Sequence, residues 1–253
     1  MSLALAEAIA REAGAELRAR FVAAERRGVS SKSTPTDLVS EADLAAEALI
    51  RERLRAERPD DAIVGEEEDD HPGTSGRRWI VDPLDGTVNF LFGIPQWAVS
   101  IAVEDGQGTL AGVVYDPMRD ECWAAERDGP ALLDGTPVAA SARAELASAL
   151  VATGFGYDPE VRRVQAAVVA RLLPRVRDIR RAGAAALDLA WTAAGRYDAY
   201  FERGVKLWDV AAGELICRRA GLEVRRLEPA PPADAGLLVA PQALAGELYA
   251  LVG

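Results

Sequence analysis

The residues from 79 to 95, WIVDPLDGTVNFLFGIP, carry the densest set of groups that could bind a metal ion and a phosphate. The apolar, partly β-branched run 79–81 predicts a short buried strand, and polar, turn-forming residues follow it. The strand is therefore expected to deliver Asp82 to its carboxyl end. Pro83 favours an extended conformation for Asp82, and Gly86 permits a backbone geometry that a side chain forbids, so a sharp turn is predicted.

Such a turn gathers the ligand types that Mg²⁺ and a phosphate require. It can bring the carboxylates of Asp82 and Asp85 together and aim the Leu84 carbonyl inward. The amides of Gly86 and Thr87 can then receive the phosphate, with the Thr87 hydroxyl beside the same point. Oxygen ligands suit Mg²⁺, and backbone amides suit an anion. The alternative is that D-P-L-D-G is only a turn between two elements, because Asp, Pro and Gly are common in turns.

Two further segments place carboxylates next to predicted secondary structure. Residues 63–68, IVGEEE, indicate another strand that ends in acidic residues, and residues 206–213, KLWDVAAG, place Asp209 at the start of a predicted helix. With the GEE, DPLDGTVNF and WDVAAG motifs in this order, the chain resembles the inositol monophosphatase family of Mg²⁺-dependent, lithium-sensitive phosphatases. The resemblance extends from about Lys32 to Gly221.

The resemblance implies a centre for two or three Mg²⁺ ions that share carboxylates. The first ion would bind Glu66, Asp82 and the Leu84 carbonyl. The second would bind Asp82, Asp85 and Asp209, so that Asp82 bridges the two ions. One ion would lower the pKa of the attacking water and the other would neutralise the leaving oxygen.

A third, weaker ion would lie near Glu66, with Glu67 as a less direct contributor. Residues 68–70, which continue the acidic run, are expected to form a solvated loop. Asp209 can also be interpreted as a helix N-cap, and this role is compatible with metal binding because the positive end of a helix suits a carboxylate.

The residues before the first motif supply groups that could act on the water and cover the site. Ser40 followed by Asp43 predicts a capping box at a helix start. The resemblance implies a second role for Asp43, which would pair with Thr87 and, together with Glu66, help to polarise the attacking water. It also implies that Lys32 lies in a mobile loop over the site, and turn-forming residues surround this lysine.

The resemblance further implies where the alcohol portion of the substrate binds. The family uses a glycine-small-small segment, here Gly183, Ala184 and Ala185, together with an acidic residue ahead of the tryptophan motif, here Glu202. Lys206 departs from the histidine that animal relatives usually have at this position, which leaves the alcohol specificity open.

Residues 155–157 are expected on the same rim. Other interpretations of the nearby side chains remain open: Glu202 can instead pair with a surface arginine such as Arg196 or Arg203, and Trp208 fits core packing better than substrate contact.

Composition narrows the possible classes of function. The chain has 253 residues, 49% of them hydrophobic, and a net charge of −11, which argues against a general nucleic-acid surface. The single histidine, His71, lies in a polar loop, so a histidine-based hydrolase or zinc site is not expected. Cys122 and Cys217 are predicted to be buried free thiols. A signal peptide and a membrane span are not recognised, and a cytoplasmic protein is expected.

The spacing of apolar residues predicts a layered α/β (α+β) protein. Helices are expected over 2–27, 41–56, 159–173, 184–194 and 209–220 and at the C-terminus, and strands over 63–64, 79–81, 98–103, 110–115, 121–125, 149–153, 176–180, 197–202, 222–227 and 236–240. Hairpin signals between 98 and 125 predict an antiparallel meander. The resemblance implies a five-layered α-β-α-β-α sandwich of the inositol monophosphatase/fructose-1,6-bisphosphatase type. Residues 1–140 and 141–253 are expected to form two halves of one compact unit.

We therefore expect Mg²⁺-dependent hydrolysis of a small phosphate monoester, with myo-inositol 1-phosphate as the first candidate. Related specificities are alternatives: histidinol phosphate, fructose 1,6-bisphosphate and 3′-phosphoadenosine 5′-phosphate. A metal-binding regulatory protein without turnover is a further alternative, although a non-catalytic descendant need not retain all of Glu66, Asp82, Asp85, Thr87 and Asp209. Neither a nucleic-acid partner nor a membrane is expected, and the resemblance implies a homodimer.

Overall fold

The computed structural model describes residues 2–23, 30–31 and 38–253. The expected lid residue Lys32 and the predicted helix end at Gly28 lie outside these residues. The seven α-helices of the described chain are α1 (Ser2–Val22), α2 (Glu41–Glu57), α3 (Thr87–Phe92), α4 (Pro159–Leu172), α5 (Ala185–Ala193), α6 (Leu207–Arg219) and α7 (Gln242–Val252). Short 3₁₀ turns occur at Leu146–Ser148 and Leu173–Arg175.

The first sheet has the strand order β3-β4-β5-β6-β7-β8-β9. Its strands are β3 (Ala62–Gly65), β4 (Arg78–Asp85), β5 (Ala98–Asp105), β6 (Gly108–Asp116), β7 (Glu121–Glu126), β8 (Leu132–Leu133) and β9 (Thr136–Pro137). All neighbours are antiparallel except β3 and β4, which run parallel. The predicted meander is therefore confirmed.

The second sheet has the order β11-β10-β12-β14-β13. Its strands are β10 (Leu150–Thr153), β11 (Asp178–Arg180), β12 (Ala199–Arg203), β13 (Glu223–Leu227) and β14 (Gly236–Ala240). β10 runs parallel to β11 and β12, whereas β14 is antiparallel to β12 and β13. A two-stranded pair, β1 (Ser30–Ser31) with β2 (Leu38–Val39), lies outside both sheets.

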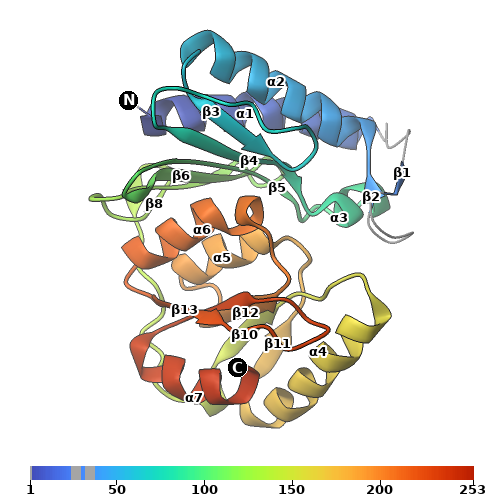
Figure 1. Cartoon of the computed structure of the whole chain (residues 1–253). Coiled ribbons are helices and arrows are strands. Elements are labelled where there is room, and N and C mark those ends of the chain that lie inside the picture. The colour runs from blue at the N-terminus through green and yellow to red at the C-terminus, as the bar shows by residue number, and fades with distance from the viewer. Residues whose placement is uncertain (1, 24–29, 32–37) are drawn as a thin grey trace.

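Three apolar clusters hold the layers together. One joins α1 and α2 to the outer face of the first sheet, one places α5 and α6 between the sheets, and one joins α4 and α7 to the outer face of the second sheet. The order is therefore α-β-α-β-α, as Figure 1 shows from top to bottom, and the predicted five-layered fold is confirmed.

Strand β5 shows how the sequence separates these layers. Val99 and Ile101 belong to the outer cluster, whereas Ala98 and Ala102 belong to the central one, because successive strand residues point to opposite faces. The small residues on the inner face let the middle helices approach closely. A β-carbon added to Gly112 would lie 2.8 Å from the Ala212 α-carbon of α6. The motif at the start of α6 is thereby held against the first sheet.

Both cysteines are buried and free, as predicted. None of the described helices is both long and apolar enough to cross a lipid bilayer.

Candidate active site

Strand β4 carries both acids of the D-P-L-D-G motif. Its pairing with β5 shifts between Asp82, opposite Ser100, and Asp85, opposite Ala98, so one extra residue bulges out. The predicted strand end at Val81 is corrected, because the strand continues through the bulge to Asp85. The Leu84 amide donates to Asp82 Oδ1 at 3.0 Å. Both carboxylates are buried, and both border the cavity described below.

Gly86 makes the turn after β4. Its φ of +97° lies in the left-handed region, and an added β-carbon would lie 2.9 Å from the Gln96 carbonyl oxygen. The chain then enters the single-turn helix α3 at Thr87. The Thr87 hydroxyl lies 2.9 Å from Asp43 Oδ1 and 3.2 Å from the Leu84 carbonyl oxygen, so its one proton can be donated to either. The turn thus sets a hydroxyl beside the acids.

Asp43 has two sets of contacts. Its Oδ2 accepts from the Ser40 amide at 2.9 Å and from the Ser40 hydroxyl, which completes the predicted capping box of α2. Its other oxygen faces Thr87. Burial raises the pKa of Asp43 despite the bonds from Ser40 and Thr87. Helix capping and the Thr87 contact therefore coexist in one fully buried carboxyl group.

Glu66 is brought to the site by the parallel pairing of β3 with β4. Gly65 is paired with Val81. The residues that follow them, Glu66 and Asp82, therefore lie at the same edge of the sheet. Glu66 is partly buried and borders the same cavity as Asp82. The side chains of residues 68–70 are exposed, in agreement with the predicted solvated loop.

A buried ion pair on α2 holds the acidic turn in place. Arg51 Nε lies 2.7 Å from Glu47 Oε1, and both side chains are at most 1% exposed. Glu47 accepts from the amides of Glu67 at 2.9 Å and Glu68 at 3.1 Å. Arg51 donates to the carbonyls of Glu68 at 3.0 Å and Asp69 at 3.1 Å.

The strand end beside this ion pair has no room for a side chain. A β-carbon on Gly65 would lie 2.2 Å from Glu47 Oε1. The sequence analysis missed Glu47 and Arg51, because a Glu-Arg pair four residues apart is typical of an exposed helix face.

Asp209 lies in the first turn of α6. The helix begins at Leu207, two residues earlier than predicted, so Asp209 is its third residue and not its N-cap. Asp209 Oδ2 accepts from the Lys206 amide at 2.6 Å, in the geometry of a capping box. The Lys206 ammonium is exposed and lies 3.8 Å from Asp234, at the mouth of the cavity.

Asp85 caps a helix from the other half of the chain. Its Oδ1 accepts from the Ala185 amide at 3.0 Å and its Oδ2 from the Ala186 amide at 2.7 Å. Ala184, the N-cap residue of α5, has no side-chain cap of its own. The carboxylate of Asp85 therefore satisfies two amides that a helix start leaves without partners. This bond pair joins the D-P-L-D-G motif to the predicted alcohol-binding segment.

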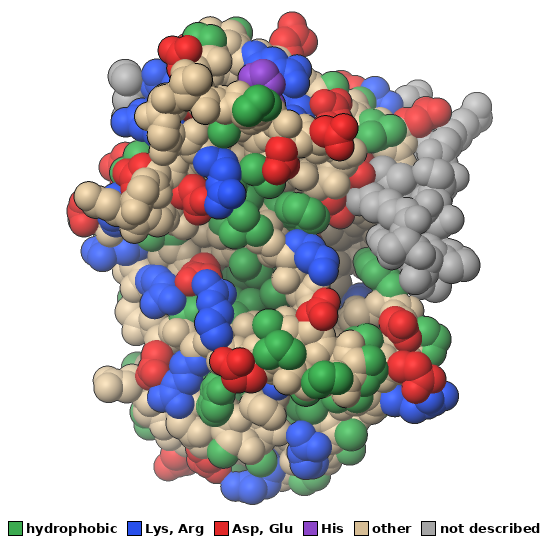
Figure 2. All heavy atoms as spheres, in the orientation of Figure 1, with side chains coloured by type: hydrophobic (Ala, Val, Ile, Leu, Met, Phe, Trp, Pro, Cys, Tyr) green, Lys and Arg blue, Asp and Glu red, His purple; other side chains and the backbone are tan. Residues whose placement is uncertain are grey.

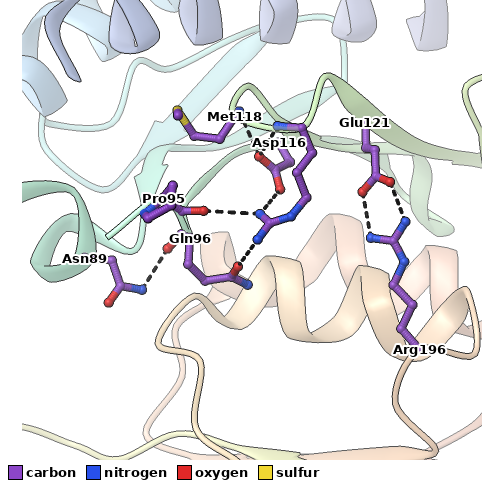
Figure 3. A network of polar contacts seen from close by, with 8 residues as sticks. Asn89, Pro95, Gln96, Asp116, Met118, Glu121 and Arg196 are labelled. Atoms are coloured by element: carbon purple, nitrogen blue, oxygen red, sulfur yellow. Dashed lines mark hydrogen bonds and ion pairs between the residues drawn. The ribbon is translucent and has the colours of Figure 1, made fainter. Parts of the chain in front are cut away.

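Asn89 makes a second connection to that segment. Its amide nitrogen donates to the Gln96 carbonyl at 2.7 Å and the Ala182 carbonyl at 2.9 Å. Figure 3 shows the same residue beside Gln96, whose side chain accepts from Arg119. Arg119 also donates to Asp116, at 2.6 Å, and its guanidinium lies over the Trp191 ring. This network ties the turn after α3 to β6 and α5.

Glu202 lies inside the cavity and not on the outer surface. Its Oε2 accepts from the Tyr200 hydroxyl at 2.8 Å. Neither arginine named in the alternative pairs with it, because Arg196 pairs with Glu121 and Arg203 donates to the Glu228 carbonyl. The exposed Arg181, which borders the same cavity, opposes the rise in the pKa of Glu202. Trp208 packs against the central apolar cluster, as expected, and also borders the cavity.

A cavity of ≈ 510 Å³ brings together the described residues of the candidate site. Its lining contains Glu66, Asp82, Leu84, Asp85, Gly86, Thr87, Gly183, Ala184, Ala185, Glu202 and Asp209, whereas Asp43 lies behind Thr87. A larger groove, of ≈ 670 Å³, lies on the opposite side of residues 205–207 and contains none of these acids. Figure 2 shows one face of the molecule, hollowed between the upper and lower halves.

The buried acids raise one another's pKa values. Burial, followed by the charges of Glu66, Asp85 and Asp209, raises the pKa of Asp82 well above its usual range. Burial raises the pKa of Asp85 to about 7 although two amides bind it. Burial and Asp85 raise that of Asp209 to about 8. Burial raises the pKa of Glu202 to about 7, against the bond from Tyr200. Like charges crowded in this way favour a multivalent cation.

The donor set fits Mg²⁺ in kind, since it consists of carboxylates and a carbonyl around one cavity. Among the described residues, no group of three or more acids, histidines or cysteines converges closely enough to hold one ion. The amides of α5 bind both oxygens of Asp85, and the Lys206 amide binds one oxygen of Asp209. Each of these oxygens keeps a second lone pair, with which the same carboxylates could also bind an ion.

The raised pKa values predict how pH affects the metal-free protein. Asp85, Glu202 and Asp209 hold protons in the folded chain at pH values where the unfolded chain has lost them. Their contribution to stability is complete below the ordinary pKa of about 4 and is lost as pH rises through about 7 to 8. Without Mg²⁺, the unfolding free energy should therefore fall between about pH 5.5 and 8.5.

Chemical denaturation at several pH values, with EDTA or with Mg²⁺, measures this effect. Mg²⁺ should flatten the curve, because it binds the deprotonated carboxylates. The triple variant Asp85→Asn, Glu202→Gln and Asp209→Asn should have a flatter curve without metal than the wild type, although the buried Asp43 and Asp82 remain. A metal-free stability that rises over this interval would contradict the assignment of protons to these acids.

The chain is similar to known proteins over nearly its whole length. A sequence model described as the inositol monophosphatase family matches residues 2–252. The chain is 44% identical to inositol-1-monophosphatase SuhB of Mycobacterium tuberculosis, with 97% of this chain and 91% of that protein covered. It is 40% identical to Nus factor SuhB of Salmonella typhimurium, with 87% and 82% covered.

A solved structure shows the same similarity in three dimensions. The extragenic suppressor protein suhB of Bartonella henselae superposes with a TM-score of 0.93 at 35% identity, and 99% of this chain and 98% of that chain are covered. Sequence and fold thus point to the same group of proteins. The chain belongs to the inositol monophosphatase family.

Proposed function

We propose that the protein hydrolyses a small phosphate monoester in a Mg²⁺-dependent reaction, with myo-inositol 1-phosphate as the first candidate substrate. The observation that carries this proposal is the cavity beside Thr87 in which burial and neighbouring carboxylates raise the pKa values of Asp82, Asp85 and Asp209. Two or three bound Mg²⁺ ions would supply the charge that activates water and stabilises the leaving oxygen. In the proposed ligand sets, Glu66, Asp82 and the Leu84 carbonyl hold one ion, and Asp82, Asp85 and Asp209 hold another.

The chain's own groups then divide the remaining work. Thr87, oriented by Asp43 at 2.9 Å, can accept a proton from water and pass one on to the carboxylate. The amides of Gly86 and Thr87 are proposed to bind the phosphate. Glu202 and the small residues 183–185 are proposed to bind the alcohol portion of the substrate. Lys32, outside the described residues, is proposed as the lid.

A second role is favoured by one relative. The Salmonella typhimurium protein at 40% identity is named as a Nus factor, so a regulatory function through a partner is a candidate for this chain as well. The net charge of −11 favours a protein partner over direct contact with nucleic acid. The two roles can exist in one protein.

Purified protein should be assayed with Mg²⁺ against a panel of phosphate monoesters. The panel contains myo-inositol 1-phosphate, histidinol phosphate, fructose 1,6-bisphosphate, 3′-phosphoadenosine 5′-phosphate and an aryl phosphate. Turnover should require Mg²⁺ and should fall with millimolar Li⁺, which can occupy a hard-cation site without matching its charge. Binding of Mg²⁺ without turnover on any ester would favour the regulatory alternative. Sedimentation would test the proposed homodimer.

Glu202→Gln is expected to separate the alcohol end from the phosphate end. A carboxylate held by Tyr200 can accept bonds from polyol hydroxyls, and a site built for such bonds discriminates against analogues that lack them. We expect kcat/KM for the polyol phosphate to fall about tenfold, with little change for the aryl phosphate. Glu223→Gln, at a partly exposed pair with Arg225 on β13, is the control. Equal losses on both substrates would rule out a specificity role for Glu202.

A further inference from the structure

The segment Gly154–Tyr157 lies between β10 and α4 and borders the same cavity as Glu202. It carries no carboxylate, ammonium or guanidinium group, and the sequence analysis expected only its residues 155–157 on the rim of the site. Its contacts are nevertheless unusually specific for a loop. They connect helix α4 to the Glu202 carboxylate, which is proposed to bind the alcohol portion of the substrate.

Gly154 lies directly against Glu202. β10 and β12 run in parallel with Thr153 paired to Phe201, so the next residues along each strand, Gly154 and Glu202, are adjacent. A β-carbon on Gly154 would lie 2.0 to 2.2 Å from all three atoms of the Glu202 carboxyl group. With Oε2 bound to Tyr200, this carboxyl group is fixed from two sides. Any side chain at position 154 must displace it.

Helix α4 holds the segment at Gly156, two residues after Gly154. The Gly156 amide donates to Gln165 Oε1 at 3.0 Å, and the Gly156 carbonyl accepts from Arg162 Nε at 2.7 Å. Gln165 is only 7% exposed, and it borders a small cavity, of ≈ 10 Å³, whose lining also includes Glu202. The peptide groups before and after Gly156 are thus each held by a side chain from α4, and one of these side chains, that of Gln165, is buried.

We propose that Gly154 and Gln165 are specificity-positioning residues, which set the alcohol preference of the enzyme by fixing the place of the Glu202 carboxylate. Gly154 leaves the space that the carboxylate fills, and Gln165 keeps the segment from closing that space. The proposal rests on the phosphatase function proposed above and adds to it the residues that determine which alcohol is accepted. The substrate class is a phosphate ester whose alcohol presents hydroxyl donors to a rigid acceptor.

The test compares Gly154→Ala, Gln165→Leu and Arg163→Leu, with and without Glu202→Gln. Arg163 lies on the exposed side of α4, where it pairs with Glu160, and serves as the control for changes to that helix. Initial rates are measured with a polyol phosphate and an aryl phosphate, and thermal unfolding is recorded for each variant. We expect Gly154→Ala and Gln165→Leu to lower kcat/KM about tenfold for the polyol phosphate and less than about twofold for the aryl phosphate.

The double variants decide whether the effect passes through Glu202. Residues that act through one group give non-additive losses, so Gly154→Ala should have little further effect once Glu202→Gln is present. Additive losses, or equal losses on both substrates, would overturn the proposal. If Gly154→Ala does not fold, the same comparison with Gln165→Leu decides. A wild-type protein without turnover on any ester would instead refute the phosphatase function itself.

Discussion

Replacing Asp82 with asparagine is expected to lower kcat by roughly 10³-fold while it stabilises the metal-free protein. Asp82 is buried, and burial together with Glu66, Asp85 and Asp209 raises its pKa. A neutral amide removes the cost of burying this charge, so the unfolding free energy without Mg²⁺ should rise at pH 7.5. It also removes the carboxylate proposed to bridge two ions, so stabilisation by Mg²⁺ should largely disappear.

Kinetics at saturating Mg²⁺ and denaturation with and without the metal provide both measurements. Asp178→Asn is the matched control, since Asp178 is an exposed aspartate paired with Arg180. Its loss should change stability little and leave turnover intact. An Asp82→Asn enzyme with near wild-type kcat would refute the two-ion scheme, and a less stable metal-free form would refute the electrostatic argument.

The second large effect is expected at the buried ion pair of α2. Glu47→Leu leaves the Arg51 guanidinium buried beside an apolar side chain, and breaking a buried pair in this way should destabilise the protein by about 3–5 kcal/mol. It also removes the acceptor for the amides of Glu67 and Glu68. The turn that carries Glu66 should then lose its fixed position, and the Mg²⁺ concentration for half-maximal rate should rise.

The double variant Glu47→Leu with Arg51→Met separates the two consequences. An apolar pair of similar volume often replaces a buried ion pair without loss of stability. In denaturant unfolding, we expect the double variant to recover most of the lost free energy of unfolding. The higher Mg²⁺ concentration for half-maximal rate should persist, because no side chain then holds residues 67–69. Recovery of both properties would show that the ion pair serves stability alone.

The catalytic motifs were identifiable from sequence because their chemistry is local. Asp82, Asp85 and Thr87 lie within six residues, and the bulge and turn that orient them are built from Pro83 and Gly86, whose backbone preferences are intrinsic. The capping box of Ser40 and Asp43 is equally local. These residues therefore took nearly the positions expected, although β4 extends further and α6 begins earlier than predicted.

The supporting residues could not be identified in this way, because burial depends on the whole fold. Glu16 and Arg20 have the same spacing and residue types as Glu47 and Arg51, yet the first pair is partly exposed and the second is buried. No local pattern distinguishes the two pairs. Gly154 likewise resembles any loop glycine until β12 brings Glu202 beside it.

The middle layer gives the site a property that its list of ligands does not suggest. The first two amides of helix α5 donate to Asp85, and the amide just before helix α6 donates to Asp209. The positive ends of these two helices therefore already stabilise the charge of two carboxylates. Each oxygen that accepts one amide hydrogen bond keeps a lone pair for a metal ion. The two helices therefore hold the acids together when no ion is bound and still leave them able to bind one. We expect the proposed centre to fill and empty with the fold unchanged.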